Sequence, residues 1–66
     1  MKVSLAAARV NAKKTQAEVA DIMGISKTTI VAWEKNKTQP GVKEFIELCK
    51  IYNCSMDDIF FPVKST

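Results

Sequence analysis

The sequence predicts a small all-α domain of five short helices. Its 66 residues, 47% hydrophobic and 26% charged, have the composition of one globular domain and leave no room for a second. Residues that begin or end helices, chiefly Ser, Thr, Gly and Asn, recur between short amphipathic segments. We therefore expect a single domain over residues 1–66, with a folded core over about 3–61 and a loose tail at 63–66.

The first helix is expected over residues 3–12. This segment is rich in alanine, and its apolar face carries Leu5, Ala8 and Ala12. Lys13 and Lys14 follow this segment, and the helix is expected to end there.

The second helix is expected to begin after Thr15 and to run to Met23. Thr15 and Glu18 have the spacing of a capping box, in which each side chain binds the backbone N–H of the other residue. Gly24 ends the helix, because glycine adopts the left-handed conformation at little cost. The apolar stripe consists of Val19, Ala20 and Met23.

The third helix is expected from Lys27 to about Lys35, with Ser26 as its N-cap. About three residues, the first of them glycine, separate it from the second helix. That spacing is typical of a helix-turn-helix. Asn36 is the expected left-handed residue at its end, because Asn tolerates this conformation better than other non-glycine residues.

The fourth helix is expected over residues 42–52, with Asn53 at its end. Its apolar residues follow the full amphipathic spacing, at Phe45, Leu48, Cys49 and Tyr52.

A last short helix is expected to begin at Ser55 and to stop before Pro62. Asp57 and Asp58 fall in its first turn, where the helix dipole favours acids. Cys49 and Cys54 are interpreted as free thiols that act as small buried hydrophobes.

The charge is unevenly distributed. Residues 1–39 carry seven positive and three negative side chains, whereas residues 40–66 carry three and four. A basic N-terminal part favours a polyanionic partner, although a net charge of +3 could also serve solubility alone.

The composition argues against several classes of function. The chain has no histidine and two cysteines, so we expect no metal site, no cofactor and no catalysis. It contains no apolar run of about 18 residues that could span a membrane. The N-terminus lacks the apolar core of a signal peptide, and a reducing cytoplasmic location is expected.

The third helix carries an unusual outer face. Ile30 and Trp33 lie on its predicted buried side, and the opposite side falls among Thr28, Ala32 and Lys35, with Val31 beside it and Lys27 and Thr29 toward its edges. Short side chains let a helix approach base edges, where methyl groups contact thymine and lysine donates to guanine. The alternatives are a neutral surface or a packing surface for another protein.

Residues around this helix could hold a DNA backbone. Gln16 lies at the start of the second helix, where free N–H groups and the dipole favour a phosphate. Such contacts position a protein on DNA without reading sequence. The expected phosphate contacts are Lys14, Gln16, Ser26, Lys35, Asn36, Lys37 and Thr38.

Glu34 adjoins the buried Trp33 and needs a partner, because leaving a half-buried carboxylate unpaired costs several kcal/mol. Arg9 is the only arginine of the chain and lies on the inner side of the first helix. We expect the two residues to form a structural ion pair.

Over roughly residues 5–60, the chain resembles the phage-repressor or Cro-like (XRE-like) helix-turn-helix family. The matching segments are 15–20, 24–26, 29–34, Pro40 and 54–59. The resemblance implies a compact five-helix, lambda-repressor-like domain with the helix-turn-helix at helices two and three. It also implies a phosphate contact at Gln16, base contacts at Lys27, Thr28, Thr29 and Ala32, and backbone contacts from Asn36 to Thr38.

Two positions depart from the family pattern. Asn36 stands where the family usually has glycine, and Ala32 stands where some relatives carry a long polar reader. Fewer hydrogen bonds to bases would increase the reliance on thymine methyl groups or DNA shape.

The resemblance further implies a homodimer on double-stranded DNA. Ile59 and Phe60 are expected to fill the core and to leave Phe61 exposed, so Phe61 and Val63 are the candidate dimer contacts; Phe61 could also fold back onto its own core. The expected function is sequence-specific transcription regulation, as a repressor on a palindromic operator. The alternative is a protein-interaction module on the same fold, such as an antitoxin or a protein that binds an antirepressor.

Overall fold

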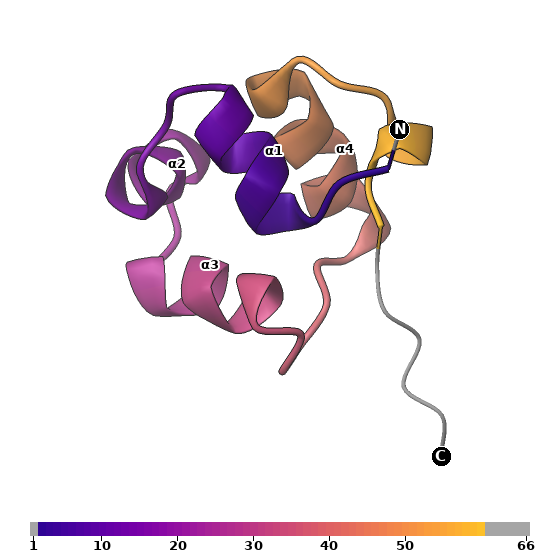
Figure 1. Cartoon of the computed structure of the whole chain (residues 1–66). Helices are drawn as coiled ribbons and strands as arrows, with labels where there is room; N and C mark the ends of the chain where they lie inside the picture. Colours follow the sequence, from indigo (N-terminus) through magenta and orange to yellow (C-terminus); the bar gives the residue numbers. More distant parts are fainter. Residues whose placement is uncertain (1, 61–66) are drawn as a thin grey trace.

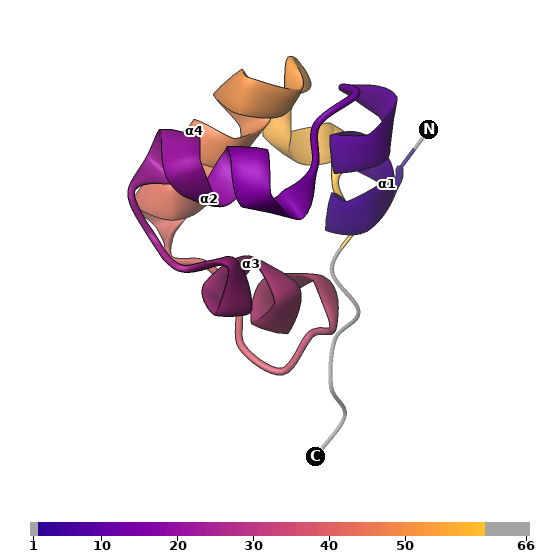
Figure 2. The ribbon, with the colours of Figure 1, turned by 90° about the vertical axis from the view of Figure 1, so that its left-hand side faces the viewer.

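The computed structural model describes residues 2–60. Within this range the chain forms four α-helices, α1 (Leu5–Asn11), α2 (Gln16–Met23), α3 (Lys27–Glu34) and α4 (Val42–Tyr52), followed by one 3-10 turn, η1 (Met56–Asp58). Both ribbon views place α3 below the other three helices (Figures 1 and 2). The all-α prediction is confirmed over these residues, apart from a single isolated β-bridge.

The expected fifth helix is a single 3-10 turn, so the five-helix count is not confirmed. Ser55 occupies the N-cap position as expected, but its hydroxyl accepts no backbone N–H of residues 2–60; its own N–H and hydroxyl both donate to Asp58 Oδ2, at 3.1 Å. Ile59 then adopts an extended conformation, with φ −100° and ψ 130°, and forms a parallel β-bridge with Val3. This pairing draws the chain out of the helical conformation after three residues.

The same bridge shortens α1 at its start. Phe60 N–H donates to the Val3 carbonyl at 2.7 Å, and Val3 N–H donates to the Asp58 carbonyl at 2.8 Å. Val3 is therefore extended, and the helix begins only at Leu5, after the N-cap Ser4.

The N-caps follow the sequence prediction. Thr15 and Glu18 form both hydrogen bonds of the capping box, at 2.8 and 3.0 Å. Ser26 caps α3 by accepting from the Thr29 N–H at 3.3 Å.

All four α-helices end in the same Schellman geometry. In each, a residue with positive φ follows the last turn, and the next N–H donates to the carbonyl five residues back, at 3.0–3.2 Å. The predicted left-handed residues Gly24 and Asn36 are confirmed, and Asn53, expected at the end of the fourth helix, is left-handed as well. Lys13 ends α1 in the same way, with φ 60°, where a lysine is unfavourable.

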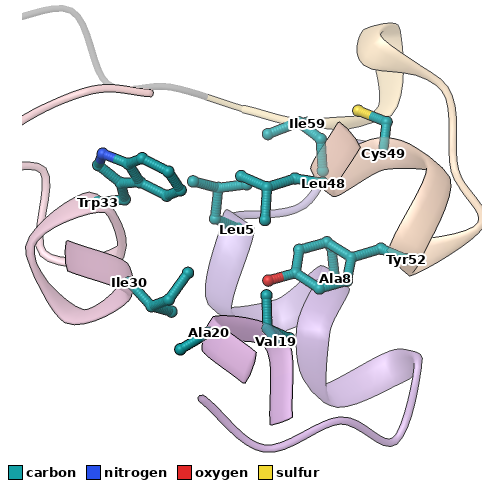
Figure 3. Packing of buried hydrophobic residues seen from close by; sticks show 10 residues of the cluster. All are labelled: Leu5, Ala8, Val19, Ala20, Ile30, Trp33, Leu48, Cys49, Tyr52 and Ile59. Carbon is teal, nitrogen blue, oxygen red and sulfur yellow. The ribbon is translucent and has the colours of Figure 1, made fainter. Parts of the chain in front are cut away.

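The core lies between α3 and the other three helices (Figure 3). The predicted faces of all four helices are confirmed as buried or packed against this core. Cys49 is buried and Cys54 partly buried, and both are free thiols. The buried hydrophobic residues are Leu5, Ala8, Val19, Ala20, Ile30, Trp33, Leu48, Cys49, Tyr52 and Ile59.

One prediction about the core is wrong. Ile59 is buried, with 6% of its surface exposed, but Phe60 is 52% exposed. Successive side chains of an extended segment point to opposite sides, so a buried Ile59 directs Phe60 to solvent. The dimer candidates Phe61 and Val63 lie outside the described residues.

Among residues 2–60, no helix is long and apolar enough to cross a membrane. The same residues hold no group of three or more His, Cys, Asp or Glu side chains that could bind a metal ion.

Candidate nucleic-acid interface

The outer side of α3 is open to solvent. Ile30 and Trp33 point into the core, and in both ribbon views the opposite side of the helix faces away from α1, α2 and α4 (Figures 1 and 2). Thr28 lies on this outer side and is exposed, while Ala32 is partly exposed. The outer side of α3 is therefore accessible to a partner along its length.

Every residue expected to contact DNA has some accessible surface. The exposed ones are Ser26, Lys27, Thr28, Lys35, Lys37 and Thr38. The partly exposed ones are Lys14, Gln16, Thr29, Ala32 and Asn36. Lysines thus lie at both ends of a central stretch of short, uncharged side chains.

Thr29 and Thr28 differ in what their hydroxyl groups already bind. The hydroxyl of Thr29 lies 3.1 Å from that of Ser26, and the Ser26 oxygen also accepts from the Thr29 backbone. Within the described chain, no side-chain hydrogen bond involves Thr28. Of the two threonines, Thr28 is therefore the one whose hydroxyl is uncommitted on the outer face.

The start of α2 leaves backbone donors available. The capping box uses the N–H groups of Thr15 and Glu18. Over residues 2–60, no hydrogen bond engages the N–H groups of Gln16 and Ala17, as expected for the first turn of a helix. These two donors, together with the helix dipole, favour an anion at this end.

Arg9 and Glu34 form the ion pair that the sequence predicts. Arg9 Nε donates to Glu34 Oε2 at 2.7 Å and Nη2 donates to Oε1 at 3.3 Å, a two-point contact. The Arg9 side chain is 16% exposed and that of Glu34 8%. The hydrogen bond to Glu34 raises the pKa of Arg9 above its usual value.

Two further bonds connect this pair to the start of α2. Gln16 Nε2 donates to Glu34 Oε1 at 3.0 Å, and Arg9 Nη1 donates to the Lys14 carbonyl at 2.9 Å. Sequence reasoning missed both, because it treated Gln16 and Lys14 as independent surface residues.

Buried Tyr52 lies near the Arg9–Glu34 pair. Burial, and then the Glu34 carboxylate, raise the pKa of Tyr52 to about 12.

The segment after α3 turns sharply at Asn36, with φ 61°. This turn places Lys37 and Thr38 directly beyond the end of the helix, and both are exposed. Lys37 N–H closes the turn by donating to the Ala32 carbonyl at 3.0 Å.

A model of a protein family described as helix-turn-helix matches residues 5–59. This chain belongs to the XRE-like helix-turn-helix family. The resemblance noted from the sequence is thereby confirmed, and residues 24–26 form the short connection between α2 and α3 that the sequence predicts.

Two archaeal proteins are similar to this family member. One, from Methanocaldococcus jannaschii, is 37% identical over 46 residues, which cover 70% of each chain. The other, from Archaeoglobus fulgidus, is 35% identical over 52 residues, which cover 79% of this chain and 73% of that protein. Both are described as uncharacterised HTH-type transcriptional regulators. No solved structure gives a significant match.

Proposed function

We propose that this protein is a DNA-binding transcription regulator that inserts α3 into the major groove of double-stranded DNA. The observation that carries the proposal is the outer face of α3. It is accessible, it has a centre of short uncharged side chains, and lysines lie at both ends of it. Membership of the helix-turn-helix family and the two related regulators support the same function.

In this proposal Lys27, Thr28, Thr29 and Ala32 face base edges. Lysine donates to guanine O6 and N7, the threonine hydroxyl meets several base edges, and the alanine methyl group contacts thymine. Thr28 is the threonine whose hydroxyl contacts a base edge, since the Thr29 hydroxyl is engaged with Ser26. Thr29 contributes its methyl group.

The phosphate contacts flank this helix on two sides. Gln16 and Lys14 lie at the start of α2, where uncommitted N–H groups add to the attraction. Asn36, Lys37 and Thr38 lie beyond the C-terminal end of α3, and Ser26 and Lys35 lie at its two ends. These groups set the register of the protein on DNA, while the α3 face reads sequence.

We further propose that the protein acts as a homodimer on a palindromic operator and that it represses by occupying it. A two-fold dimer places its recognition helices about 34 Å apart, one turn of DNA. The exposed Phe60 and Met56, near the C-terminal end of the described chain, support an apolar contact there. Phe61 and Val63 remain candidates for the same contact.

Selection from a random pool of duplexes, followed by sequencing of the bound fraction, tests this function. The proposal expects an enriched palindrome whose half-sites lie about one turn apart. An enriched but unsymmetrical site would remove the dimer from the proposal. Absence of any enrichment would contradict sequence-specific binding and favour a protein partner for the α3 face.

A further inference from the structure

One carboxylate, that of Glu34, joins three helices at the edge of the candidate interface. Its Oε1 accepts from Arg9 in α1 and from Gln16 in α2, while Glu34 itself ends α3. Arg9 Nη1 also donates to the Lys14 carbonyl. The two residues held in this way, Lys14 and Gln16, flank the capped start of α2.

We propose that Glu34 and Arg9 are positioning residues for DNA binding. They hold the Gln16 amide and the Lys14 backbone, before DNA arrives, in the arrangement that meets a phosphate at the start of α2. This inference rests on the proposed function, and it gives the ion pair a role beyond joining α1 to α3.

The hydrogen-bond capacity of Gln16 allows both contacts at once. A side-chain amide carries two N–H donors, and Glu34 takes one of them. The second is available to a phosphate oxygen that also accepts from the backbone N–H groups of Gln16 and Ala17. A glutamine that is already held loses less side-chain entropy on binding than one that moves freely.

The charges of Arg9 and Glu34 are compatible with a phosphate at the start of α2. A lone carboxylate beside a phosphate would repel it, but Arg9 contacts both oxygens of Glu34 and neutralises the group. With 8% of its side chain exposed, Glu34 presents almost no negative surface to DNA. The pair can therefore support Gln16 without weakening the attraction for DNA.

A third hydrogen bond of Arg9 stabilises the loop before α2. Lys13 has a left-handed backbone that disfavours a lysine. The bond from Arg9 Nη1 to the carbonyl of the next residue, Lys14, helps to keep this turn closed. The backbone of Lys14 is thereby held beside the start of α2.

The test replaces the pair by two apolar residues, Arg9→Met together with Glu34→Met. This double variant keeps the net charge at +3, so long-range attraction to DNA is unchanged. Replacement of a buried ion pair by apolar residues of similar volume is often neutral for stability. The variant therefore separates support of Gln16 from stabilisation of the fold.

The probe is a fluorescein-labelled pool of random-sequence duplexes at 50 mM salt, since phosphate contacts act on any sequence. In the native chain, Gln16→Ala should weaken binding about fivefold, the effect of one ordinary hydrogen bond. The double Met variant should weaken it at least as much. Adding Gln16→Ala to that variant should then change affinity by less than about twofold, because the two effects share one contact.

Two results would overturn the inference: native affinity in the double Met variant, or an equal loss from Gln16→Ala in both backgrounds. Ile59→Val, a mild core change outside α2 and α3, controls for destabilisation and should keep native affinity. If the unmodified protein does not bind the pool, the proposed function itself fails and the inference falls with it.

A measurement on the unmodified protein covers the case in which the double variant does not fold. Nitrogen relaxation compares the side-chain amide of Gln16 with that of Gln39, an exposed loop residue. The inference expects a rigid Gln16 amide, with an order parameter near 0.85, and a mobile Gln39 amide below about 0.6. Equal mobility of the two amides would contradict it.

Discussion

Val3 and Ile59 form a parallel β-bridge that joins the first described residues to the last. Hydrogen bonds of 2.7 and 2.8 Å hold the two segments together. The bridge accounts for three features at once: the late start of α1, the single turn of η1, and the exposure of Phe60 directly after a buried Ile59.

This bridge predicts opposite responses at two neighbouring apolar residues. Ile59→Ala should lower the free energy of unfolding by about 2–4 kcal/mol, because it removes most of a buried side chain. Phe60→Ser should change it by less than about 0.5 kcal/mol in dilute solution, as is usual for exposed positions. Urea unfolding followed by circular dichroism measures both. A larger loss at Phe60 would show that its ring packs against the core.

Lys13 predicts a stabilising substitution. Lys13→Gly should raise the free energy of unfolding by about 1 kcal/mol, because glycine adopts positive φ without the steric cost of a side chain. The melting temperature should rise by about 5 °C. A protein no more stable than the native one would contradict the left-handed turn at Lys13.

Gly24 supplies the matched control, since it holds the equivalent position in α2. A Cβ added there meets no atom within 4 Å, so any cost comes from the backbone alone. Gly24→Ala should therefore lower the free energy of unfolding by about 1 kcal/mol.

The two capping boxes predict a loss of stability in acid. The N–H groups of Thr15 and Ser55 lower the pKa of Glu18 and Asp58 in the folded chain. A lowered folded pKa stabilises the protein above the unfolded pKa, near 4, and this contribution is lost as the pH falls through the folded pKa. At pH 7 the Glu18→Gln and Asp58→Asn double variant should have a lower melting temperature than the native protein. The difference between the two melting temperatures should shrink as the pH falls toward 2.

Thermal melts from pH 7 to pH 2 check this convergence. Glu47→Gln together with Asp21→Asn removes two exposed acids outside either capping box and matches the change in net charge. If the melting temperatures of the double variant and the native protein differ by the same amount at every pH, the capping carboxylates are not the source of the acid sensitivity.

Two lysines should separate base reading from phosphate binding. Lys27→Ala should weaken binding to the selected operator by about 1–3 kcal/mol and relax preference at one base pair, with little effect on random DNA. Lys37→Ala should weaken binding to the operator and to random DNA alike, and it should lower the slope of log affinity against log salt by about one. Titration of labelled duplexes measures both. An equal loss on random DNA for Lys27→Ala would reassign it to a phosphate.

Local features of this fold could be predicted from the sequence, whereas its non-local contacts, the Arg9–Glu34 pair excepted, could not. The Thr15 capping box, the Ser26 cap and the left-handed Gly24 depend on neighbours within a few residues, so short patterns reveal them. The left-handed Lys13 escaped prediction because lysine rarely takes that conformation. Phe60 was misplaced because its environment depends on pairing with Val3, far away in the sequence.

In the candidate site, too, some features could be predicted from the sequence and others could not. The outer face of α3 follows from helical periodicity, and the Arg9–Glu34 pair follows from the need of a half-buried carboxylate for a partner. The bond from Gln16 to that carboxylate joins residues 18 positions apart. No local pattern signals it, and it appears only when α2 and α3 are packed together.

The most direct test of the proposed function is the salt dependence of binding to a selected duplex. If a dimer neutralises about 6–10 phosphates, affinity should fall by roughly 10³–10⁵ between 50 and 200 mM salt. Anisotropy of a labelled duplex is suited to this titration, since the only tryptophan, Trp33, is buried in the core. A steep fall would support DNA binding through the basic residues around α3. Affinity that changes little with salt, or no binding at 50 mM, would contradict it.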